Sequence, residues 1–301
     1  MSQTVITVRD LSCRFKNKVA LDGVTLEMQS GRVFGLVGEN GAGKTTLMKH
    51  LLGSLTPQSG EVRVLDHEPV RDPVSVLARV GYMSEDRDLP RWMRLNELLR
   101  YTAAFFPDWD QDYAESMLAQ FDLDPASRVR TLSRGELAKT SLLLALAHRP
   151  PLLLLDEPSS GLDAVSRRDI LAVVVRSVAE EGRTVVFSSH LLDEVERVAD
   201  DVAMIHHGKV VLNDTMDNIR ANHQRRVVRF SENMDAFPEC ACALHAEGEG
   251  REWSVTTHGE AAETRAALEA LGAEILEETS PTLEALFVAR VAGARGKQKA
   301  A

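Results

Sequence analysis

Apolar residues follow two alternating spacings along the first two thirds of the chain. Short, nearly continuous apolar runs have the length of buried strands, and between them apolar residues recur every three or four positions, as on one face of a helix. The strands predicted from these runs are residues 4–8, 19–28, 33–37, 61–65, 80–84, 152–155, 184–188 and 202–205. The predicted helices are residues 45–52, 96–105, 112–121, 134–147, 164–180 and 191–198.

This order of elements predicts an α/β fold. Strands that alternate with helices form mostly parallel sheets. The first two strands are joined by a polar connection that contains Phe15, and we expect them to form an antiparallel edge sheet. Helical spacing without strands after residue 95 predicts a largely helical insertion at about residues 87–150.

A second, smaller domain is expected where the alternation stops, at residues 222–226. Strands at 227–230 and 253–255 are predicted beyond it, with a helix at 260–271. A last helix is predicted at 280–288, with Ser280 as N-cap and Pro281 at its first position. The expected division is a main domain at 1–222, a small α+β accessory domain at 223–292 and a disordered tail at 293–301.

The segment Gly-Glu-Asn-Gly-Ala-Gly-Lys-Thr-Thr, residues 38–46, fits the phosphate-binding pattern G-x-x-x-x-G-K-[ST]. A predicted strand precedes it and a predicted helix follows, which is the context that the motif requires. Glycines allow successive backbone amides to face phosphate oxygens. Lys44 would reach the β- and γ-phosphates, and the Thr45 hydroxyl would bind Mg²⁺. The structural alternative is a glycine-rich turn with an incidental lysine.

Composition narrows the classes of function. The 301 residues include 45 acidic and 35 basic side chains, and the net charge of -10 argues against a general nucleic-acid binder. No apolar run approaches the ~18 residues of a membrane span, and no signal segment is visible, so we expect a cytoplasmic protein. Cys13, Cys240 and Cys242 lack a complete metal-ligand set, which favours reduced thiols over a metal site.

Two carboxylates, Asp156 and Glu157, directly follow the strand predicted at 152–155. Ligands of open α/β sheets bind at the C-terminal ends of strands. Adjacent strand residues point to opposite faces, so one carboxylate could address a metal ion and the other a water molecule. The alternative is a pair of carboxylates that merely ends a strand at the surface.

Together with Leu-Ser-Arg-Gly-Glu at residues 132–136, these motifs resemble the nucleotide-binding subunits of ATP-binding cassette (ABC) transporters over residues 5–212. The resemblance implies a P-loop NTPase core with a mostly parallel sheet. It identifies Ser133, Arg134, Gly135 and Glu136 as the signature loop, which acts on the ATP of the second subunit. Arg134 replaces the common Gly and Glu136 the commoner Gln, but these side chains need not enter the phosphate site.

The resemblance also assigns roles to individual residues. Catalytic roles fall to Lys44, to Glu157 as the carboxylate that polarises water, and to His190 as the switch histidine; metal roles fall to Thr45, Asp156 and Glu85. ATP-binding roles fall to Phe15, Gly38, Glu39, Asn40, Gly41, Ala42, Gly43, Lys44, Thr45 and Thr46, and the D-loop to Ser160, Gly161, Leu162 and Asp163. Glu85 stands where the family usually has glutamine, and its carboxylate would repel the γ-phosphate unless a metal or proton offset the charge. Phe15 would stack on adenine or, alternatively, pack at the sheet edge.

The implied function is Mg²⁺-dependent ATP hydrolysis by a dimer that drives a separate membrane permease from the cytoplasmic face. The accessory domain and the Glu85 region favour export of the ABC-2 type by analogy. Leu89, Trp92, Met93, Phe105 and Phe106 would form the face that receives the permease, or would pack in the core. A soluble ABC ATPase acting on ribosomes or DNA repair is the main alternative, although two cassettes or a long coiled coil would then be expected. A small-molecule kinase or GTPase would leave the signature loop and His190 unexplained.

Overall fold

The computed structural model of this chain describes the backbone of residues 3–299 and the side chains of residues 3–292. The chain forms two compact units, one ending at Val210 and the other beginning at Val211.

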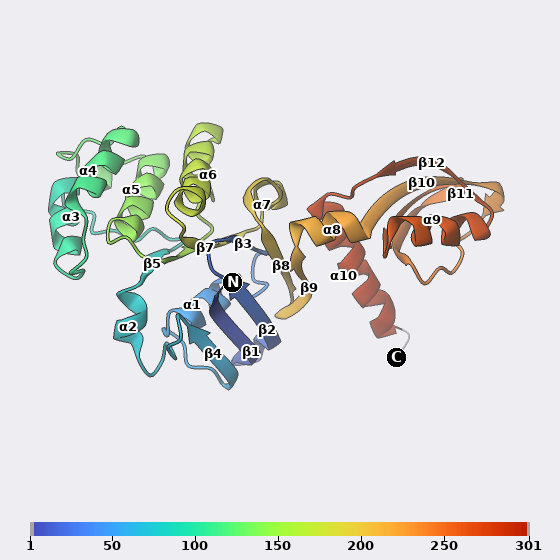
Figure 1. Ribbon diagram of the computed structural model, residues 1–301, viewed down its shortest axis with the longest axis horizontal. Coiled ribbons are helices and arrows are strands. Elements are labelled where there is room, and N and C mark those ends of the chain that lie inside the picture. The colour runs from blue at the N-terminus through green and yellow to red at the C-terminus, as the bar shows by residue number, and fades with distance from the viewer. Residues whose placement is uncertain (1–2, 300–301) are drawn as a thin grey trace. The chain divides into compact units, whose positions relative to one another are not determined.

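The first unit is built on a six-stranded sheet with the order β5-β6-β7-β3-β8-β9 (Figure 1). The pairs β5/β6, β6/β7, β7/β3 and β3/β8 are parallel, so their C-terminal ends share one edge. β3, β6 and β7 are buried throughout, which is why they read as nearly continuous apolar runs. The strands are β3 (Val33–Val37), β5 (Val80–Met83), β6 (Leu152–Asp156), β7 (Thr184–Ser189), β8 (Asp201–His206) and β9 (Lys209–Thr215).

A separate antiparallel sheet has the order β2-β1-β4, as the edge-sheet prediction requires. Its strands are β1 (Thr4–Phe15), β2 (Lys18–Gln29) and β4 (Ser59–Val64). β1 is longer than predicted, because register shifts carry the pairing with β2 through polar positions up to Phe15 opposite Lys18. Phe15 therefore ends a strand and does not lie in a polar connection.

Helices cover the parallel sheet, and α3, α4 and α5 group beside β5 as the expected helical insertion (Figure 1). The helices are α1 (Lys44–Leu51), α2 (Pro73–Leu77), α3 (Leu95–Ala103), α4 (Gln111–Gln120), α5 (Arg134–Leu146), α6 (Ala164–Ala179) and α7 (Leu192–Val198), with a 3₁₀ turn at Val129–Thr131. Helix α2 was not predicted, because its one apolar turn is too short to show a period. Asp72 caps it by accepting from the Ser75 amide at 3.2 Å. The α/β fold class predicted from the sequence is confirmed.

The second unit has an antiparallel sheet with the order β11-β10-β12. Val228, Phe230, Trp253, Val255 and Leu268 form much of its apolar core. Cys240 and Cys242 are free thiols whose sulfur atoms lie 2.7 Å apart, and burial raises the pKa of Cys242 to about 12. The elements are α8 (Met216–Asn222), β10 (His223–Met234), β11 (Ala243–His258), α9 (Ala261–Ala270), β12 (Ala273–Thr279) and α10 (Leu283–Lys299).

Polar residues at 223–226, where the sequence analysis ends the pattern, begin strand β10. Arg226 is fully buried there, and its guanidinium donates to Glu278 at 3.0 Å, to Thr264 at 2.8 Å and to further oxygens. A buried charge is tolerated when it is paired and hydrogen-bonded in this way. The division of the chain into these units falls within β9, whereas the boundary was expected after residue 222.

The C-terminal helix differs from its prediction at both ends. α10 begins at Leu283, and the Thr282 hydroxyl accepts from the Ala285 amide at 3.2 Å, so Thr282 and not Ser280 acts as the cap. The helix continues to Lys299 through a stretch predicted as a disordered tail, although that stretch contains Gly293 and Gly296, which disfavour a helix interior. Residues 300–301 of that prediction lie outside the described residues. Among the described residues, no helix has both the length and the apolar character to cross a membrane.

Candidate nucleotide site

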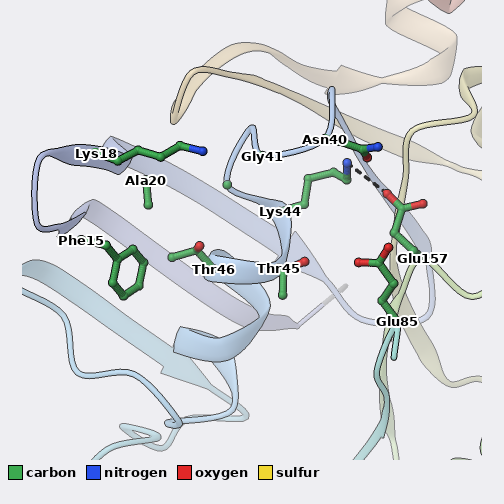
Figure 2. A pocket seen from close by; sticks show the side chains of 11 residues that line it. Phe15, Lys18, Ala20, Asn40, Gly41, Lys44, Thr45, Thr46, Glu85 and Glu157 are labelled. Carbon is green, nitrogen blue, oxygen red and sulfur yellow. Dashed lines mark ion pairs between the residues drawn. The ribbon is translucent and has the colours of Figure 1, made fainter. Parts of the chain in front are cut away.

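The pocket that contains the phosphate-binding loop lies at the C-terminal edge of the parallel sheet (Figure 2). Because β6, β7 and β3 are neighbours in the sheet, their C-terminal ends bring Glu157, His190 and the phosphate-binding loop together. The cavity has a volume of about 300 Å³. It is lined by Phe15, Lys18, Ala20, Asn40, Gly41, Gly43, Lys44, Thr45, Thr46, Glu85 and Glu157.

Two glycines of the loop are required by close packing. Gly43 precedes helix α1 with φ at 119°, and a Cβ atom there would lie 2.5 Å from the carbonyl oxygen of Ala20. A Cβ atom at Gly38 would lie 2.3 Å from the carbonyl oxygen of Ile205. Larger residues would therefore push the loop away from β2 and β8, and with it the amides at the start of α1 that favour an anion.

The three residues assigned catalytic roles form one chain of contacts. Lys44 Nζ lies 3.0 Å from Glu157 Oε1, and both side chains are about 5% exposed or less. Glu157 Oε2 lies 2.7 Å from Nδ1 of His190. Lys44 also donates to the carbonyl of Gly38 at 2.6 Å, which holds its ammonium group over the loop. The dashed line in Figure 2 marks the Lys44–Glu157 ion pair.

The backbone adopts a left-handed conformation at Glu157, directly after Asp156. β6 ends at Asp156, and Glu157 has φ at 48°, which is uncommon for a residue other than glycine. The Ser188 hydroxyl accepts from the Glu157 amide at 2.9 Å and donates to Asp156 Oδ1 at 2.6 Å. Strand alternation was expected to point the two carboxylates to opposite faces. That explanation is wrong, because Glu157 is not in the strand.

The oxygen atoms of the residues with assigned metal roles suit a magnesium ion, although Asp156 does not line the pocket. Asp156 is fully buried, and its Oδ2 has no hydrogen-bond partner among the described residues. Thr45 and Glu85 both line the pocket, and Figure 2 shows the Glu85 carboxylate near that of Glu157. Carboxylate and hydroxyl oxygens are ligands that Mg²⁺ accepts. A bound Mg²⁺ would offset the repulsion between these carboxylates and a triphosphate.

The far wall of the pocket comes from the antiparallel sheet. Phe15 is 47% exposed at the end of β1 and lies in the pocket wall with Lys18 and Ala20 of β2 (Figure 2). Lys18 and Ala20 were not predicted as site residues, because no sequence motif includes them. The hairpin register that places Lys18 opposite Phe15 is the signal that could have found Lys18.

The signature loop does not line the pocket of its own chain. Ser133 caps helix α5: its hydroxyl accepts from the Glu136 amide at 3.2 Å, and its own amide donates to the Glu136 carboxylate at 2.8 Å. The donation from the Ser133 amide lowers the pKa of Glu136. Glutamine would make the same pair of bonds, which explains why glutamate is tolerated here. Gly135 has a packing role as well, because a Cβ atom there would lie 2.4 Å from the Ser166 hydroxyl.

The D-loop residues follow Glu157 in a tight turn outside the pocket. Asp163 caps helix α6 by accepting from the amides of Val165 and Ser166, each at 3.0 Å. Arg134 of the signature loop lies beside this turn, with one guanidinium nitrogen 3.7 Å from the position of a Cβ atom on Gly161. The two motifs are therefore neighbours within one chain.

Known proteins resemble the chain across most of its length. Residues 21–160 match the family model described as ABC transporter. The ABC transporter ATP-binding protein YtrB of Bacillus subtilis is 26% identical over 97% of this chain and 99% of its own length, so the likeness includes the second unit. The daunorubicin resistance ATP-binding protein DrrA3 of Streptomyces coeruleorubidus is 33% identical over 73% of this chain and 71% of its own. A solved ATP-binding subunit of an ABC transporter is 29% identical, covers 72% of this chain and 92% of its own, and superposes with a TM-score of 0.66. This chain therefore belongs to the ABC transporter family, as an ATP-binding subunit and ATPase.

Proposed function

We propose that this subunit binds Mg²⁺ and ATP in the pocket described above and hydrolyses ATP with Glu157 as the general base. The observation that carries the proposal is the Lys44–Glu157–His190 chain of contacts at the end of the phosphate-binding loop. Lys44 and the loop amides would stabilise charge on the γ-phosphate. His190 would orient the Glu157 carboxylate toward the attacking water, while Asp156, Thr45 and Glu85 would hold the ion.

Dimerisation would complete each site. Ser133 lies outside its own pocket, so it would donate to the phosphate of a second copy of the chain. Its hydroxyl accepts from the Glu136 amide and keeps its hydrogen free for such a donation. ATP-binding subunits of this family dimerise and pair with membrane permeases. A homodimer with two ATP molecules between its copies agrees with these features.

A permease would dock on the exposed part of the face expected from the sequence. Trp92 is 71% and Phe105 64% exposed, and such large apolar side chains on a surface are typical of an interface. Phe106 instead stacks on His148 at 4.0 Å between ring centroids, so it has the packing role that was the alternative. The subunit would then sit peripherally on the cytoplasmic face. Export is supported by the likeness to a daunorubicin resistance protein and by the accessory domain.

Capture from detergent-solubilised membranes tests the partner. The tagged chain is expected to retain a protein with several membrane spans, and Trp92→Glu should lose it because a charge opposes burial of this surface. Val175→Glu, at a 42% exposed position on α6, is the matched control and should retain the permease. Capture of ribosomes or a DNA-repair complex in place of a permease would favour the soluble ABC ATPase.

A further inference from the structure

The turn that follows Glu157 is held by a residue from another loop. Arg87 lies between β5 and α3, in the same loop as Glu85. Its Nη2 atom donates to the carbonyl of Glu157 at 3.3 Å, to that of Pro158 at 3.0 Å and to that of Ser160 at 3.0 Å. One charged nitrogen therefore faces three carbonyl oxygens of the turn that carries the proposed general base.

The opposite side of this turn is also fixed. The Ser159 hydroxyl donates to Oε2 of Glu194, a buried residue of α7. The same carboxylate accepts from Ser189 at 3.3 Å, and its other oxygen pairs with Arg167 at 3.0 Å. Glu194 thus ties the turn to the end of β7, next to His190. The turn is anchored to the sheet on that side and to a loop on the Arg87 side.

These contacts stabilise an unfavourable backbone conformation. Glu157 has φ at 48° and Arg87 has φ at 49°, and both belong to the left-handed region that costs energy for side chains of this size. Such a conformation persists only where surrounding contacts enforce it. Without the Arg87 donor, the three carbonyls lose a charged partner, and the Glu157 side chain can move away from Lys44 and His190.

We infer that Arg87 is a positioning residue that holds the Glu157 turn and thereby links the Glu85 loop to the proposed general base. The link rests on the function proposed for Glu157. A positioning role of this kind predicts an effect on turnover and not on the affinity for ATP.

Three variants of the full chain test the inference. Arg87→Met keeps the length of the side chain but removes its donors, and kcat should fall about 10- to 100-fold, the scale of a small misplacement of a catalytic group. KM for ATP should stay within about twofold, because Arg87 does not line the pocket. Arg87→Lys should recover much of the rate, since a single charged nitrogen makes all the contacts to the turn. Arg91→Met, at an exposed position of the same loop, should match the unmodified chain.

A double-mutant comparison separates positioning from other effects. In the Glu157→Gln background, Arg87→Met should lower the single-turnover rate by less than about twofold, because its effect acts through the missing carboxylate. Unchanged kcat in Arg87→Met, a parallel loss of ATP affinity, no recovery with lysine, or full additivity with Glu157→Gln would each overturn the inference. Normal hydrolysis by Glu157→Gln would overturn the proposed function itself. An inactive Glu157→Gln beside a fully active Arg87→Met would overturn only the role of Arg87.

Discussion

Replacing Glu157 with glutamine should separate ATP binding from hydrolysis. Glutamine keeps the size of the side chain and removes its negative charge. Lys44 Nζ lies 3.0 Å from the carboxylate, and Coulomb's law at an effective dielectric constant of about 20 gives roughly 5 kcal/mol for this pair before desolvation. Removal of the charge frees Lys44 to interact with phosphate, so ATP affinity should be unchanged or higher.

Turnover should fall much further than affinity changes. Loss of a general base costs about 100- to 10,000-fold in rate, which corresponds to roughly 3–5 kcal/mol in the barrier. Titration with a fluorescent ATP analogue measures binding, and phosphate release measures turnover. Glu180→Gln, at the exposed end of α6, is the control for the loss of one carboxylate. A near-normal rate in Glu157→Gln, or joint loss of binding and hydrolysis, would show that Glu157 is not the general base.

Three further predictions follow from the pocket and the packing. Phe15→Ala should raise KM for ATP about 5- to 150-fold with little change in kcat, because base stacking contributes about 1–3 kcal/mol. Val19→Ala on the same hairpin should change neither constant, and equal KM values for Phe15→Ala and the unmodified chain would exclude stacking. Burial lowers the pKa of His148 from 6.5 to about 4, so the folded state loses stability as pH falls through that window. In urea titrations at pH 7 and pH 4, His148→Phe should remove roughly 3 kcal/mol of this loss, and an unchanged pH dependence would contradict the burial of a neutral His148. A chain ending at Asn222 should melt cooperatively and bind ATP, since no residue that lines the pocket follows Asn222 in the sequence. A cooperative melt without nucleotide binding would show that residues after Asn222 are needed for the site.

Local sequence patterns predicted most strands and helices of the first unit. β3 was predicted with its observed bounds, because a strand buried on both faces leaves a continuous apolar run between a turn and the glycine-rich loop. Lys44 could be assigned because its motif fixes both spacing and context. Helix α5 was predicted to within one residue at its C-terminal end, because its leucines form one broad apolar face and Pro150 and Pro151 follow it.

Long-range contacts could not be predicted from local patterns. Lys18 enters the pocket because of the hairpin register, and Arg87 contacts the Glu157 turn from 70 positions earlier in the sequence. The burial of Arg226 could not be predicted from a hydrophobicity pattern, because it depends on hydrogen-bond partners from β12, β11 and α9 that lie far away in the sequence. Such residues become visible only when the sheet order is known.

Complementation between two inactive variants tests whether each ATP is held between two copies of the chain. Lys44→Ala damages the loop side of a site, and Ser133→Arg damages the signature side by bulk and charge. In a mixed dimer, one site carries both lesions and the other carries neither. Mixing the two proteins should restore part of the ATP hydrolysis, with dimer formation in ATP measured alongside by sedimentation. If Ser133→Arg alone is fully active, with a rate per mole independent of protein concentration, the claim that ATP is held between two copies is wrong.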